Sequence, residues 1–206
     1  MDKPRNVDEY IAIQSAAVAK NPECGTSRYN LAVGLLGLKK YDEAEQELKE
    51  AIECSPTLAE AYVQLGGICL QRGDLDGCLS YNLQATRVRA GFAEGYGNIG
   101  FVQLQKGNLD EAVKALEKAV KCNVKFLQAY STLANAYLMQ GEVDKSIETN
   151  RKALELEPGF AVAHNNLAIA YLEKEDFEQA AAHCDKALEL GYEVAPEIRR
   201  EIDAHR

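Results

Sequence analysis

Apolar positions along the chain recur with a period of 34 residues. A large aliphatic residue is followed by a small one at each point of the first series, which consists of Leu31, Leu65, Ile99, Leu133 and Leu167. Alanine returns at the same interval, at Ala51, Ala85, Ala119, Ala153 and Ala187. Self-similarity at a fixed interval of this length indicates a repeat protein, in which one short structural unit is stacked several times.

The period divides the chain into five units, which are 25–58, 59–92, 93–126, 127–160 and 161–194. Each unit holds two stretches with apolar residues at helical spacing, separated by a short polar break. In the third unit we expect helices over 93–106 and 109–121. Asn108, Asp74 and Asp176 occupy the position before the second helix in three units and are predicted to be its N-cap. Each unit is therefore predicted to be a pair of helices.

The residues outside the five units follow the same period. Residues 7–24 are expected to form an N-terminal capping helix, and residues 195–206 a C-terminal capping helix with a polar outer face. One helix pair cannot bury its apolar side alone, so neighbouring units must stack. We therefore expect residues 1–206 to form a single all-α solenoid of about twelve helices.

The first helices share an aromatic residue, a Leu-Gly-like pair and, in later units, a tyrosine. These residues are Tyr62 with Leu65-Gly66, Tyr96 with Ile99-Gly100, Tyr130 with Leu133-Ala134 and Tyr137, and His164 with Leu167-Ala168 and Tyr171. In this pattern the chain resembles the tetratricopeptide repeat, a helix-turn-helix unit, over about residues 7–204. The resemblance implies a right-handed superhelical solenoid of antiparallel helix pairs.

Several positions depart from the family pattern. Asn82 and Asn150 stand where an aromatic residue is usual in the second helix. The closing proline is missing from three units, which carry Ala90, Val124 and Tyr192 instead. Without that proline we expect the second helices to run on slightly.

The charge balance is acidic and uneven. Lys and Arg number 23 and Asp and Glu 32, which gives a net charge of −9, and no basic run is present. This balance argues against nucleic acid as a partner. The units 127–160 and 161–194 carry −2 and −5. Either a partner touching this end is basic, or these charges form only a solvated acidic surface. No apolar stretch approaches the ~20 residues of a membrane span, and no signal-like segment is present. We therefore expect no membrane insertion and a cytoplasmic location.

The sequence offers little catalytic chemistry. It contains no phosphate-binding loop, no nucleophile elbow and no HExxH motif. The six cysteines include no CxxC pair and share no metal-site spacing with the histidines, so we expect neither cofactor nor metal. His183 and Cys184 are adjacent, but neighbours on a helix point about 100° apart and do not face each other. The chain is predicted not to be an enzyme.

The resemblance implies that the first helix of each unit lines a concave groove that binds a partner. The predicted groove residues are Asn30, Val63, Gln64, Gly67, Gly97, Asn98, Phe101, Ser131, Thr132, Asn135, Asn165 and Asn166. Side-chain amides donate and accept hydrogen bonds, so they can hold a peptide backbone without reading its sequence. The alternative is that these amides bond to the solenoid itself or to water.

Two further features have alternative interpretations. Gly67 and Gly97 either leave a trough in which a ligand chain approaches the helix closely, or make room for a bulky neighbour such as Phe101. Phe92, Phe126 and Phe160 lie in the turns between units. They either wedge between consecutive units or, if exposed, mark a second binding edge.

The sequence predicts a protein–protein interaction module that acts as a scaffold, adaptor or assembly factor. It would bind an extended or helical segment of another protein in its groove. The alternative is a self-assembling structural protein that forms homo-oligomers.

Overall fold

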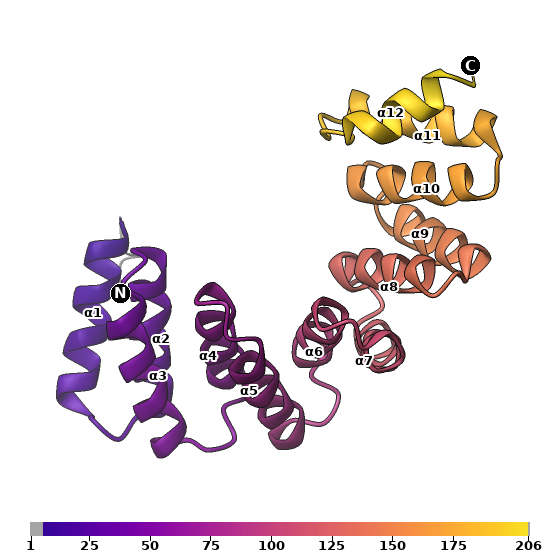
Figure 1. Cartoon of the computed structure of the whole chain (residues 1–206). Coiled ribbons are helices and arrows are strands. Elements are labelled where there is room, and N and C mark those ends of the chain that lie inside the picture. Colours follow the sequence, from indigo (N-terminus) through magenta and orange to yellow (C-terminus); the bar gives the residue numbers. More distant parts are fainter. Residues whose placement is uncertain (1–5, 206) are drawn as a thin grey trace. The chain divides into compact units, whose positions relative to one another are not determined.

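The computed structural model describes residues 6–205 of the chain, and these residues form helices and no strands (Figure 1). The helices are α1 (Val7–Lys20), α2 (Gly25–Gly37), α3 (Tyr41–Cys54), α4 (Ala59–Gln71), α5 (Leu75–Val88), α6 (Ala93–Gln105), α7 (Leu109–Cys122), α8 (Leu127–Met139), α9 (Val143–Leu156), α10 (Ala161–Glu173), α11 (Phe177–Glu189) and α12 (Pro196–Asp203). The prediction of an all-α chain of paired helices is confirmed. The first helices of the five units begin at residues 25, 59, 93, 127 and 161, the predicted starts of the units.

Apart from its five repeat units, the chain divides into two compact halves, residues 1–102 and 103–206. In residues 1–102, α2 packs on α3 and α4 packs on α5, and α1 covers α2. In residues 103–206, α8 packs on α9 and α10 on α11, while α12 lies against α11. Each of these two halves has its own buried core of aliphatic side chains.

Small residues at the helix crossings allow this close packing. Ala32 and Ala51 are completely buried between α2 and α3, beside the equally buried Leu48. Ala168 and Ala187 have the same role between α10 and α11. A larger side chain at these positions would separate the two helix backbones, and interiors packed at crystal density leave no room for it.

The turn inside each unit places one residue in the left-handed backbone region. Glycine occupies this position three times, with φ of 77° to 78°, at Gly73, Gly107 and Gly141. The equivalent residues of the first and last units are Lys39 and Glu175, each with φ of 58°. A side chain in this conformation costs about 1 kcal/mol or more relative to glycine, so these two turns are locally strained.

The second helices do not run on where the closing proline is missing, which corrects the expectation from the sequence. α5 and α7 end at Val88 and Cys122, in phase with the end of α3 at Cys54. The same turn follows each of these three helices. The last residue of the turn is Leu58, Phe92 or Phe126, and its side chain is half-buried. The second helix thus ends at the same point whether or not proline is present. Phe92, Phe126 and Phe160 are half-buried and not fully exposed.

Two of the three predicted caps form. Asp74 accepts a hydrogen bond from the backbone N–H of Gly77 at 2.8 Å, and Asp176 accepts one from Gln179 at 3.2 Å. Asn108 makes no such bond, contrary to the prediction. Its amide donates to the side chain of Gln103 at 2.8 Å instead.

The buried asparagines of the second helices differ in how well they are bonded. Asn82 is completely buried and donates to the carbonyl of Cys78 at 2.8 Å, and burial raises the pKa of the Cys78 thiol to about 11. Asn150, equally buried, donates to the carbonyl of Ser146 at 3.1 Å. The Asn150 Oδ1 and Ser146 Oγ atoms are buried and lack any hydrogen bond. An unsatisfied buried polar atom is destabilising.

We therefore expect Ser146→Ala to raise the free energy of unfolding by about 1–3 kcal/mol, because it removes a buried hydroxyl without a partner. The measurement is urea-induced unfolding followed by circular dichroism. Ser80→Ala, at an exposed position of α5, is the matched control and reports the gain in helix propensity alone. Equal gains in the two variants would contradict the prediction.

Candidate functional site

The first-helix face of residues 1–102 is apolar and partly open. Val33 on α2 and Phe101 on α6 are 39% and 38% exposed, and Val63 on α4 is half-buried. Gly67 is exposed, and a Cβ atom placed on it would meet nothing within 4 Å. The backbone of α4 is therefore open to close approach at Gly67. Gly97 is buried, so of the two glycines Gly67 is the one with open space over its backbone.

The amide series of this unit is partly engaged with the protein itself. Asn98 on α6 donates from Nδ2 to Oδ1 of the buried Asn82 at 2.9 Å. Gln64 lies beside the hydroxyl of Tyr29, whose pKa is raised by burial. Asn30 is half-buried and forms no hydrogen bond through its side chain with other residues of the described range 6–205. Asn98 therefore bonds to the solenoid itself, as in the alternative interpretation of the amide series.

The first-helix face of residues 103–206 is polar. Thr132 and Ser131 both bond to the carbonyl of Gln128, at 2.8 and 3.3 Å. Asn166 on α10 donates to the carbonyl of Ser131 on α8 at 3.4 Å, which places these two helices side by side. Asn165 is buried, with 8% exposure, whereas Asn135 is exposed. Of the predicted polar residues on this face, Asn135 is the one most available to a ligand.

The partner of Asn98 is a feature that sequence reasoning did not identify. Asn82 lies sixteen residues before Asn98, and Asn150 lies sixteen residues before Asn166. An asparagine at the usual aromatic position of one unit is thus followed by an asparagine in the first helix of the next unit. This shared spacing was the available signal that the amide series has a role in packing.

Two histidines of the last unit form a partly buried pair. The Nδ1 atoms of His164 and His183 are 2.9 Å apart, and His164 Nε2 lies 3.1 Å from the carbonyl of Pro158. Because a carbonyl only accepts, His164 donates to it from Nε2, and a hydrogen bond joins the two Nδ1 atoms. The ring of Tyr171 stacks on His183 at 5.6 Å, and Arg151 donates to the Tyr171 hydroxyl at 2.5 Å.

The surroundings of this pair disfavour the protonated, charged form of His183. Burial, then His164 and the Arg151 cation, lower the pKa of His183 below its usual value of 6.5. The neighbouring Cys184 is 1% exposed and lies in the apolar core with Ala180. A thiol enclosed in this way is not placed for attack on a substrate.

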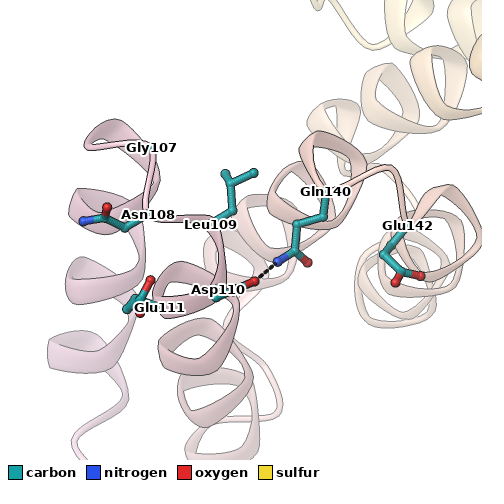
Figure 2. A pocket seen from close by; sticks show the side chains of 7 residues that line it. All are labelled: Gly107, Asn108, Leu109, Asp110, Glu111, Gln140 and Glu142. Carbon is teal, nitrogen blue, oxygen red and sulfur yellow. Dashed lines mark hydrogen bonds between the residues drawn. The ribbon is translucent and has the colours of Figure 1, made fainter.

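A cavity of about 700 Å³ lies between two turns of residues 103–206 (Figure 2). Its walls are polar, with Asp110, Glu111 and Glu142 among them. Gln140 donates to Asp110 at 2.8 Å across it. The corresponding links between other units are ion pairs, from Arg72 to Asp42 at 2.7 Å and from Lys174 to Asp144 at 2.6 Å. The cavity therefore marks a junction where an amide stands in place of a cation.

Within residues 6–205, no three His, Cys, Asp or Glu side chains gather as a potential metal-ligand set. No helix there combines the length and the apolar character needed to cross a membrane.

Repeated antiparallel helix pairs, with exposed side chains on the first helices, define an α-solenoid of helix-turn-helix repeats. The tetratricopeptide repeat matches residues 12–59 and 98–161 in one family model and 161–190 in a second. The first match alone covers more than half of the chain, and the chain belongs to this family. Tetratricopeptide repeats generally mediate protein–protein interactions and are generally not catalytic.

Comparison with individual proteins gives the same fold. TPR repeat-containing thioredoxin TTL4 of Arabidopsis thaliana is 30% identical over 76 residues, which are 37% of this chain and 11% of that protein. The chain thus spans a small part of this relative. YrrB, described as a TPR protein with an unusual peptide-binding site, is 22% identical, with a TM-score of 0.70 over 86% of this chain and 91% of its own. Pseudomonas aeruginosa pilF is 16% identical, with a TM-score of 0.79 over 97% of both chains.

We expect Asn98→Ala to lower the free energy of unfolding by about 1–3 kcal/mol, because Oδ1 of the buried Asn82 loses its donor. Asn30→Ala, the same change at the equivalent position of α2, should leave stability unchanged or slightly raised, since alanine favours the helix. Urea unfolding of both variants is the measurement. Equal stabilities would show that the bond between Asn98 and Asn82 is without consequence.

The histidine pair predicts a dependence of stability on pH. The folded-state pKa of His183 lies below 6.5, so below this pH the unfolded chain binds more protons than the folded chain and stability falls as pH falls. Between pH 7.5 and 5.5, Tm should drop more for the wild-type protein than for His183→Gln. The measurement is thermal unfolding across this range, and parallel curves for the two proteins would refute it.

Proposed function

We propose that this protein is a non-enzymatic interaction module that holds an extended or helical segment of another protein against its first helices. In this role it serves as a scaffold, adaptor or assembly factor. The observation that carries the proposal is the open backbone at Gly67 on α4. The equivalent positions of α2 and α6 carry the exposed apolar side chains of Val33 and Phe101. A segment seated there gains stability by covering apolar surface and by approaching the helix closely.

Polar groups on the first helices of residues 1–102 can orient such a segment. Asn30 on α2 leaves its amide available, and Asn98 on α6 keeps one N–H and a carbonyl beyond its bond with Asn82. These groups bond to a peptide backbone whatever its side chains are. The peptide-binding site for which YrrB is described supports the proposal by analogy of fold.

The cysteines support a reducing, cytoplasmic location. None of the six is in a disulfide, and Cys54 and Cys122 are exposed. Proteins of oxidising compartments usually pair such residues in disulfides.

Gly67→Arg provides the test. The new side chain meets nothing within 4 Å of its Cβ, so we expect the fold to be kept and Tm to be equal or higher, because glycine disfavours a helix interior. The bulky side chain should block the segment, so partner proteins captured from a lysate of the source organism should fall about tenfold, as estimated from the loss of central contacts. The measurement is affinity capture with quantitative mass spectrometry.

Ser80→Arg is the matched control, because it adds the same charge and volume at an exposed position of α5, a second helix. It should capture the same proteins as the wild-type protein. Undiminished capture by Gly67→Arg would show that the partner does not use the face around Gly67.

A further inference from the structure

A second cavity, of about 360 Å³, opens beside the last helix of residues 103–206. Four apolar side chains line it, which are Ile169 and Leu172 on α10, Phe177 on α11 and Ile198 on α12. Leu172 is 9% exposed and the other three are half-buried. The ring of His205 stacks on Phe177 at 3.9 Å and closes one side. We name this cavity the α12 pocket.

Carboxylates surround the opening of the α12 pocket. Glu173, Glu175 and Glu201 line it and are exposed. None of the three pairs with a cation among residues 6–205. Lys174, which lies between two of them in the sequence, bonds to Asp144 at 2.6 Å instead. An apolar floor thus lies under a rim whose negative charge is not neutralised within the described chain.

We propose that the α12 pocket anchors one apolar side chain of a partner protein, in a segment where lysine or arginine flanks that side chain. Burial of the apolar side chain supplies affinity, and the flanking cations meet the acidic rim, which favours encounter and excludes acidic segments. The inference rests on the proposed function as an interaction module. It does not depend on the asparagines or on the face around Gly67.

Charge complementarity decides between the possible occupants. A nucleic acid or an anionic membrane would meet three unpaired carboxylates and be repelled. A second copy of this chain would bring a net charge of −9 to the same rim. A basic segment of another protein is the occupant that both the floor and the rim favour.

Glu175 allows the rim to be altered without harming the fold. It adopts a φ of 58°, where three other units have glycine. Glu175→Gly therefore removes a rim charge and relieves backbone strain together. Lys39→Gly is the matched control, because it relieves the same strain at the equivalent turn of the first unit and does not touch the α12 pocket. Both variants should raise Tm.

The test uses a fluorescein-labelled peptide, GSKKLKKSG, whose central leucine is flanked by lysines. Fluorescence anisotropy should show saturable binding to the full chain that weakens with added salt. The double variant Glu175→Gly/Glu201→Gln should bind about tenfold more weakly, and Lys39→Gly should bind like the wild-type protein. Replacing the leucine of the peptide by serine, or its lysines by glutamates, should abolish binding.

Four results with the peptides and the rim variant would overturn the inference, and a fifth concerns Gly67→Arg. The four are absence of binding by the leucine–lysine peptide, equal binding of the glutamate peptide, no effect of the double variant, and displacement of the peptide by self-association of the chain. Gly67→Arg should bind the peptide normally, and loss of binding in that variant would place the peptide elsewhere and also overturn the inference. Because the Gly67 capture experiment and the peptide experiment use different surfaces, failure of the proposed function and failure of the α12 pocket are distinguishable.

Discussion

Close approach of two helix backbones at alanine is the constraint on which the rest of this structure depends. Four alanines are completely buried at helix crossings, Ala32 and Ala51 in residues 1–102 and Ala168 and Ala187 in residues 103–206. Because the same crossing recurs every 34 residues, each helix pair adopts nearly the same geometry and presents its first helix in the same way. The proposed binding surfaces are therefore the outer sides of helices whose inner sides are determined by packing.

A regular repeat makes its exceptions informative. Gly67 leaves a helix backbone open, Gln140 replaces a cation that links other units, and Glu175 keeps a side chain where glycine would be less strained. None of these three residues improves the stability of the repeat, and two of them, Gly67 and Glu175, are exposed. Natural proteins depart from local rules mainly where function requires it, which is why these positions are more telling than the periodic residues.

The buried asparagines show how packing and surface are connected. Asn82 needs a donor for its Oδ1 atom, and Asn98 supplies it from the neighbouring first helix. Part of the amide series is thus committed to stability before any ligand is present. The second asparagine pair lacks this bond, and Asn150 Oδ1 remains unsatisfied. Equivalent sequence spacing is therefore compatible with two different bonding patterns, because small shifts between helices decide which donor reaches the acceptor.

The sequence by itself determined the helix pairs, their starting residues and the family, because periodicity and helical spacing depend on residues close together in the chain. It did not determine that Asn108 bonds to Gln103, that Gly97 is buried while Gly67 is open, or that α10, α11 and α12 enclose a cavity. These features depend on side chains from different helices meeting at distances of a few ångströms. Only tertiary packing sets those distances, since the repeat pattern is the same for a satisfied and an unsatisfied asparagine.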